Sequence, residues 1–183
     1  MKRILQNLIH IDSPKRFGLC VLSYFVFGIL GLQLTLINKT SSPIWPASGL
    51  AIVLLTAWGK QYWRAILIGA FAVNLTTPVP WWTAFAIGIG NTAEAVIGYH
   101  IYFYFLFRWR KSFDARLRSA AVTSILAPLS SALVGSTAVS LLSQKGFLDG
   151  FWEIFSTWWV GDFIGILLIF PFLIFYREWN QNW

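Results

Sequence analysis

A stretch of twenty almost uninterrupted apolar residues, numbers 17–36, most constrains what this chain can fold into. A run of that length matches the roughly 20 residues that an α-helix needs to cross the hydrocarbon core of a bilayer. Basic residues precede it, and it is too long and lacks a clear small-residue cleavage site, so it is predicted to be a membrane span rather than a signal peptide.

The rest of the chain contains further apolar runs and has too little charge for a soluble domain. Only 11% of the 183 residues are charged and 57% are hydrophobic, whereas a soluble domain carries about 25% charge. The length allows about six spans of roughly 20 residues with short loops. We therefore predict an all-α integral membrane six-helix bundle.

Prolines and basic residues mark the ends of the six predicted spans. These are residues 17–36, 46–58, 63–75, 82–107, 119–142 and a last run that ends near 176. The second and third are short, and a re-entrant hairpin is the alternative there. That hairpin would bury Lys60 and Arg64 at its tip, which is energetically expensive, so two short spans joined by a basic turn are favoured.

The fifth span is rich in small residues. Ala127, Ser131 and Gly135 form a stripe that suits close helix packing, and Pro128 is predicted to kink the helix.

Charge placement predicts the orientation. With both termini in the cytoplasm, the cytoplasmic segments hold twelve of the fourteen Lys and Arg residues, which satisfies the positive-inside rule; Lys39 and Lys145 lie outside. We expect cytoplasmic segments at residues 1–16 and 177–183 and a membrane domain at 17–176. Because the positive charges flank apolar runs, the expected partners are membrane lipids and not nucleic acid.

The last apolar run places a carboxylate among aromatic and small residues. Trp158, Gly161, Asp162 and Gly165 fall at i, i+3, i+4 and i+7, which is one face of a helix. Glycines let another backbone approach closely, and a carboxylate at bilayer depth usually faces the interior of a bundle. A partner helix is therefore implied.

The fourth span repeats this spacing with Asn91, Glu94, Ala95 and Gly98. At 1.5 Å per residue, Glu94 lies roughly 18 Å and the other acid roughly 10 Å below the outer ends of their spans. The two carboxyl groups are thus predicted to be close enough to share a cavity.

Two acids without a nearby base can protonate, share a proton, or be neutralised by a cation or a ligand amine. One interpretation is a ligand, ion or proton site; the other is that the acids are neutral and only join helices. Asn74, near the outer end of the third span, and Trp45, Pro46 and Ser48, at the start of the second, are candidates for the mouth of such a site; the alternative is that each only marks the membrane interface.

No signal for catalysis or for a metal or cofactor is present. The single cysteine, Cys20, excludes a cysteine-cluster metal site, and His100 points to a different face from Glu94. Because no nucleophile elbow, phosphate loop or HExxH motif occurs, we predict no catalytic residue, no metal and no cofactor.

Four sequence blocks occur in a fixed order: PIWPASGLAIVLL, WRAILIGAFAVNL, GNTAEAVIG and WWVGDFIGILLIFP. In this order and spacing they resemble the membrane-associated sensor domain of the first (MASE) class, over about residues 43–171. The positions that carry the resemblance are Trp45, Pro46, Gly49, Gly69, Asn74, Asn91, Glu94, Trp159, Gly161, Asp162, Gly165 and Pro171.

The resemblance implies a multi-pass sensory module of the bacterial inner membrane, as found N-terminally in histidine kinases and diguanylate cyclases. The family's ligands are mostly undefined. Members usually continue into further spans and a cytoplasmic output domain, whereas this sequence closes with REWNQNW. We therefore expect a missing output domain or a separate partner, which is a kinase, a cyclase or a second copy of the chain.

Three functions are weighed on this basis. The first is a sensor that binds a small ligand or ion at Glu94, Asp162, Asn91, Trp158, Trp159, Trp45 and Asn74 and signals to the cytoplasm. The alternative is the substrate-binding component of a vitamin-type importer of the energy-coupling-factor class, which the size, the six spans and the basic central loop resemble. A membrane-embedded enzyme is the third.

Overall fold

The computed structural model describes residues 13–34, 42–110, 112–142 and 147–181, and all of its regular structure there is helical. The all-α prediction is confirmed. The helices are α2 (Pro14–Gln33), α3 (Pro46–Trp58), the 3-10 turn η1 (Lys60–Tyr62), α4 (Trp63–Asn74), α5 (Trp81–Arg108), α6 (Phe113–Leu126), α7 (Pro128–Ser140) and α8 (Phe147–Gln181). Residues 1–12 of the predicted N-terminal segment, Lys39 and Lys145 lie outside the described residues.

The helix ends follow from local chemistry. The Ser13 side chain accepts a hydrogen bond from the backbone N–H of Arg16 and so caps α2, and Pro14 follows it in the first turn. The helix α3 also begins at a proline, Pro46, and ends at Trp58, with Gly59 as its C-cap residue. Gly59 has a φ of 105°, a conformation that costs glycine little, and this fixes the predicted basic turn into α4.

The predicted kink in the fifth span is also confirmed. The chain from Asp114 to Ser140 is one apolar stretch, but it is divided into α6 and α7 at Ala127 and Pro128. A proline inside a helix lacks the N–H that would complete the hydrogen-bond ladder, which explains the break.

Among the described residues, three stretches are long and apolar enough to cross a membrane: Pro14–Gln33, Asp114–Ser140 and Gly150–Phe172. The helices α3 and α4 have 13 and 12 residues and are short, as their sequences predicted.

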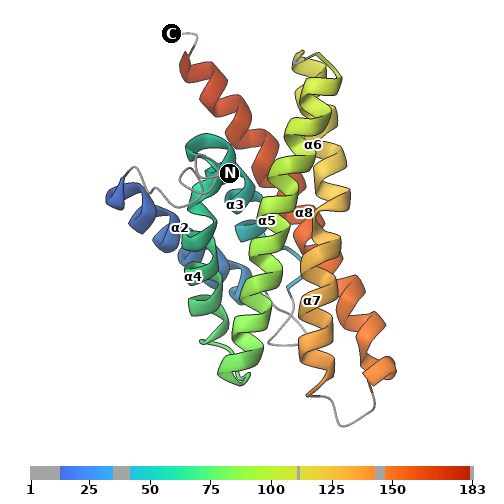
Figure 1. Ribbon diagram of the computed structural model, residues 1–183. Helices are drawn as coiled ribbons and strands as arrows, with labels where there is room; N and C mark the ends of the chain where they lie inside the picture. The colour runs from blue at the N-terminus through green and yellow to red at the C-terminus, as the bar shows by residue number, and fades with distance from the viewer. Residues whose placement is uncertain (1–12, 35–41, 111, 143–146, 182–183) are drawn as a thin grey trace, which may run out of the picture.

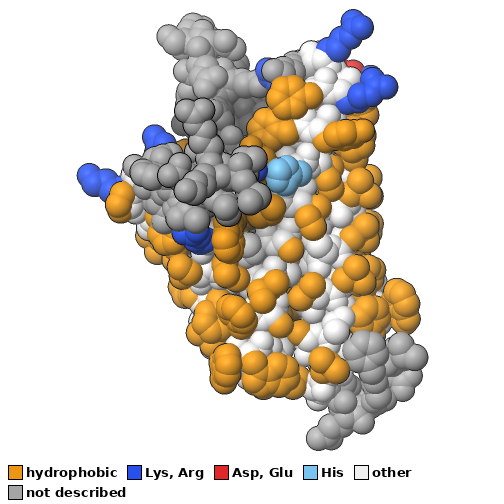
Figure 2. Space-filling model, in the orientation of Figure 1, with side chains coloured by type: hydrophobic (Ala, Val, Ile, Leu, Met, Phe, Trp, Pro, Cys, Tyr) orange, Lys and Arg blue, Asp and Glu red, His pale blue; other side chains and the backbone are white. Residues whose placement is uncertain are grey.

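Basic residues gather toward one end of the bundle. Figure 1 shows the α3–α4 turn, the α5–α6 turn and the end of α8 at the top of the view, whereas the α4–α5 turn lies at the bottom. On the face drawn in Figure 2, the Lys and Arg side chains lie in the upper part, whereas hydrophobic side chains run down the whole face. This placement of the basic residues agrees with the orientation that the sequence predicts.

The longest helix, α8, crosses the bundle diagonally (Figure 1) and packs against α3, α6 and α7. It approaches α3 closely because its glycines have no side chain: a Cβ on Gly165 would overlap the Trp45 carbonyl oxygen, and one on Gly161 would overlap that of Ser42. The backbone N–H of Trp45 also donates a hydrogen bond of 2.9 Å to the Gly161 carbonyl. These contacts fix the start of α3 against the middle of α8.

Candidate functional site

Four polar side chains from four different helices meet in the centre of the bundle. Ser48 of α3 lies with its Oγ 2.8 Å from Glu94 Oε2 of α5 and 2.8 Å from Asp162 Oδ1 of α8. Ser131 of α7 lies with its Oγ 2.6 Å from the other aspartate oxygen, Oδ2. All four residues are 2% or less exposed. We call them the serine–carboxyl cluster.

The positions of these side chains follow from helix packing. Ser48 stands in the first turn of α3. The hydrogen bond from Trp45 to Gly161 and the glycine contacts hold this turn against α8, and Gly161 directly precedes Asp162. On the other side of α8, Ser131 belongs to the small-residue stripe of α7, where little side-chain volume separates the two helices.

A second group of polar atoms lies beside the cluster and has no hydrogen-bond partner. It comprises the Tyr24 hydroxyl, Trp45 Nε1, Asn91 Oδ1 and Glu94 Oε1, all of them buried. The hydroxyl of Tyr24 lies next to the Trp45 and Asn91 side chains and interacts electrostatically with both carboxyl groups. Buried polar atoms are nearly always paired, so these unpaired donors and acceptors make this part of the bundle a candidate site.

Sequence reasoning predicted that Glu94 and Asp162 lie together, and the shared contact with Ser48 confirms this. It placed Ser131 only in a packing stripe and gave Tyr24 no role. A signal for Tyr24 existed: with Cys20, Gly28 and Gly31 it forms the buried face of α2, where a hydroxyl needs a partner.

The other candidate residues have contacts elsewhere. Trp158 packs its ring over Gly135 of α7, and Trp159 donates its indole N–H to the Ile125 carbonyl oxygen of α6 at 3.0 Å. Asn74 donates to the carbonyl of Ala70 in its own helix. A ligand-binding role for these three residues stays a prediction.

His100 is exposed on α5 with its ring against Tyr99 and does not face the carboxyl pair. Within the described part of the chain, no three His, Cys, Asp or Glu side chains gather at one place.

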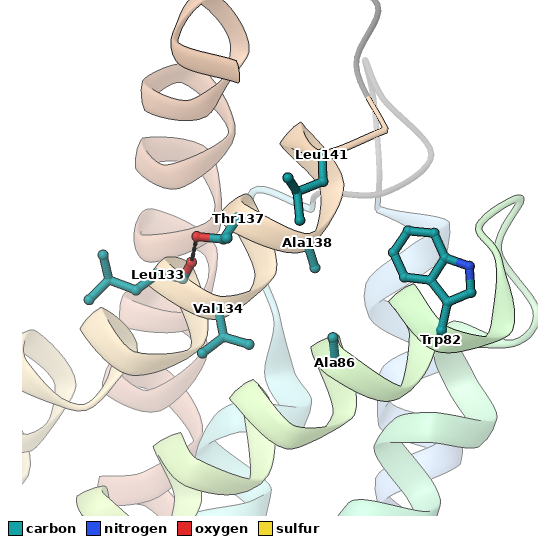
Figure 3. A pocket seen from close by; sticks show the side chains of 7 residues that line it. All are labelled: Trp82, Ala86, Leu133, Val134, Thr137, Ala138 and Leu141. Atoms are coloured by element: carbon teal, nitrogen blue, oxygen red, sulfur yellow. Dashed lines mark hydrogen bonds between the residues drawn. The ribbon is translucent and has the colours of Figure 1, made fainter. Parts of the chain in front are cut away.

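A separate cavity of about 450 Å³ lies between α5 and α7, away from the acid pair. Figure 3 shows Trp82 and Ala86 of α5 opposite side chains of α7, and the Thr137 hydroxyl donating to the Leu133 carbonyl oxygen. The full lining is Trp82, Ala86, Leu133, Val134, Thr137, Ala138 and Leu141. We call it the outer cleft; its lining is almost entirely apolar.

Fold and site together define a helical membrane protein with a buried acidic site between its helices. A family model described as MASE1 matches residues 17–183, and the chain belongs to this family of membrane sensor domains. The match confirms the resemblance seen in the four sequence blocks and makes the chain a membrane sensory module. No curated protein and no solved structure matches the chain.

Proposed function

We propose that this sensory module binds a small ligand or ion at the serine–carboxyl cluster and passes a change in helix packing to the cytoplasm. The observation that carries the proposal is the single Ser48 hydroxyl lying 2.8 Å from carboxyl oxygens of both α5 and α8. A change at either acid alters a contact that three helices share.

The physical reason is the cost of buried charge. A carboxylate sunk among helices is tolerated only when it is neutralised or fully hydrogen-bonded, so the packing of α3, α5, α7 and α8 depends on what neutralises the pair. A ligand shifts such an equilibrium only through its difference in affinity for the two packings. The acids supply this difference because their charge state decides whether the helices attract or repel one another.

The route to the cytoplasm is α8. It holds Asp162 near its middle and continues as helix to Gln181, on the side of the bundle where the basic turns lie. In the proposed orientation, in a bacterial inner membrane, this end faces the cytoplasm and meets a kinase or cyclase, or a second copy of the chain.

The test is signal output in cells. The full chain would be followed by a cyclase reporter after Trp183, and Glu94→Gln and Asp162→Asn compared with wild type. We expect each substitution to change reporter output several-fold. The matched control is Asp114→Asn, because Asp114 is an exposed acid paired with Arg118 on α6, far along the chain from both acids.

If both substitutions leave reporter output at the wild-type level, the proposal is wrong and the acids only join helices. Solute uptake into reconstituted vesicles that both substitutions abolish would instead identify the chain as an importer component.

A further inference from the structure

The serine–carboxyl cluster contains more hydrogen-bond contacts than its serine hydroxyls can supply with protons. A hydroxyl carries one proton, and an ionised carboxylate only accepts hydrogen bonds. Yet Ser48 Oγ lies 2.8 Å from both Glu94 Oε2 and Asp162 Oδ1. If both acids were ionised, one carboxylate would face the serine oxygen with no proton between them. One of the two acids must therefore carry a proton and donate it to Ser48.

The surroundings of the two acids show which one carries it. Each Asp162 oxygen has a serine hydroxyl beside it, Ser48 Oγ at 2.8 Å and Ser131 Oγ at 2.6 Å. The Ser131 hydroxyl also lies 3.0 Å from the Pro128 carbonyl oxygen of its own helix, but the carboxyl oxygen is the nearer acceptor. Glu94 has one such contact, and its Oε1 is buried without any partner. A buried anion with an unpaired oxygen is costly, so the proton belongs on Glu94.

We infer that Glu94 is a proton-binding site and that the proton is the ligand of the sensory module. The inference rests on the proposed function, because it names the ligand class of the same site. In the proton-bound state Glu94 Oε2–H donates to Ser48, and Ser48 donates to Asp162. On release, the O–H bond of Glu94 breaks, its electron pair stays on the carboxylate oxygen, and the proton passes to a water molecule of the aqueous phase as hydronium.

The groups around Glu94 determine what release does. Among the described residues, Asp162 of α8 is the charged group that acts on it, and Tyr24 of α2 is the other titratable group beside it. The helices α3 and α7 contribute the uncharged hydroxyls of Ser48 and Ser131. In the described chain, neither α4 nor α6 adds a titratable group that acts on Glu94. Loss of the proton therefore leaves two negative carboxylates on either side of Ser48, and they repel each other across α5 and α8.

The unpartnered polar atoms beside the cluster fit a second arrangement. The Tyr24 O–H and the Trp45 indole N–H are donors without acceptors. An ionised Glu94 needs donors and is repelled by Asp162, so it turns toward Tyr24 and away from α8. The site then has two discrete packings, one with Glu94 on Ser48 and one with Glu94 on the Tyr24 side, and protonation selects between them.

The experiment is infrared difference spectroscopy of the full-length chain in phosphatidylethanolamine–phosphatidylglycerol vesicles, with pH as the only variable. We expect the carbonyl stretch of a buried protonated carboxylic acid, shifted in D₂O, to disappear reversibly as the pH is raised. In Glu94→Gln this band is lost. In Asp114→Asn, the exposed-acid control, the band keeps its full amplitude.

Ser48→Ala provides a second variant that keeps both acids. Because it removes the acceptor of the Glu94 proton, the band persists but moves in frequency. Ser136→Ala is the control for this change. The Ser136 hydroxyl donates to the Ala132 carbonyl of its own helix, so its removal should leave the frequency of the band unchanged. If Glu94→Gln retains the wild-type band, or if no protonated carboxyl band appears at any pH, the inference is wrong.

The same variants separate this inference from the proposed function. A band that titrates and depends on Glu94, together with reporter output that ignores both pH and the acid substitutions, supports the proton site and contradicts the sensory role of the cluster. Reporter output that depends on Glu94 without any protonated band contradicts the proton site and leaves the sensory role standing.

Discussion

The serine–carboxyl cluster and the outer cleft are built by the same two helices in opposite ways. At the cluster, α5 and α7 contribute Glu94 and Ser131, and α3 and α8 close the site so that its side chains are buried. At the cleft, α5 and α7 contribute apolar side chains around Trp82 and Val134 and leave a space of about 450 Å³. Along α5, Ala86 stands eight residues before Glu94, about 12 Å away.

The difference shows which region of the molecule should be sensitive to substitution and which region should tolerate it. Small residues bring four helices together at the cluster, and each polar atom there constrains its neighbours. The cleft contains one hydroxyl, that of Thr137, and this hydroxyl donates to the Leu133 carbonyl of its own helix, so it needs no partner from another helix. Changes at the cluster should therefore alter stability and signalling, and changes at the cleft should alter little.

The largest effect is expected from Gly165→Val. Its Cβ would overlap the backbone carbonyl oxygen of Trp45, which cannot move without displacing α3 from α8, so the free energy of unfolding should fall by about 3 kcal/mol or more. Gly18→Val is the control, because no atom outside its own helix backbone lies within 4 Å of a Cβ there. Denaturation by SDS in mixed micelles, followed by circular dichroism, measures both; equal midpoints would show that α8 does not depend on this contact.

Next in size is Ser48→Ala. The substitution removes one hydroxyl but leaves an oxygen of Glu94 and an oxygen of Asp162 without their partner, which should lower the free energy of unfolding by about 1–2 kcal/mol. Ser136→Ala removes a hydroxyl that bonds only to its own helix and should cost less than half of that. The same denaturation assay compares them. Similar losses for the two serines would remove the distinction between the cluster and ordinary helix packing.

Trp159→Phe should have a smaller effect. It keeps an aromatic ring to stack on Phe163 and removes one hydrogen bond to the Ile125 carbonyl, and such a bond between membrane helices is worth about 0.6 kcal/mol. Trp152→Phe, at a site that is 65% exposed, serves as the control and should be neutral. A loss as large as that of Ser48→Ala, measured in the same micelles, would place Trp159 among the residues that hold the site.

The smallest effect is expected in the outer cleft. Ala86→Leu adds apolar volume to an open apolar space, so the free energy of unfolding should stay within about 0.5 kcal/mol of wild type and reporter output should not change. Thr137→Val, which removes the one hydroxyl of the lining, is the companion variant. If either substitution changes reporter output as much as Glu94→Gln, the cleft belongs to the signalling site and the contrast between the two regions is wrong.

Several features of the fold could be predicted residue by residue. The span from Pro46 to Trp58 was predicted with the ends that α3 has, because a proline in the first turn and a glycine at the end are signals that act locally. Pro128 divides the fifth span for an equally local reason, the missing N–H. Two helix starts differed by several residues. The first helix begins at Pro14 rather than Phe17, because Ser13 caps it about one turn earlier, and the helix of the fifth span begins at Phe113 rather than residue 119, because Ser112 caps it there.

The candidate site was predicted in part. Matching stripes on two helices predicted that Glu94 and Asp162 meet, since a buried acid must face the bundle. Trp158 lies on the same predicted stripe as Asp162, but its ring packs over Gly135 instead. Helical spacing gives the face on which a side chain lies but not which neighbour that face meets, and so it could not separate the aspartate from the tryptophan.

By itself, the sequence determined most of the helices and the membrane class, because apolar length, proline, glycine and basic flanks act within a few residues of where they stand. Only the tertiary structure decided that Ser48 lies between the two acids and that Ser131 supplies the second hydroxyl. It also decided that the Tyr24 hydroxyl lies beside them without a hydrogen-bond partner. These contacts depend on the relative rotation and height of four helices. Glycine contacts at Gly161 and Gly165 fix that register, and no local pattern records it.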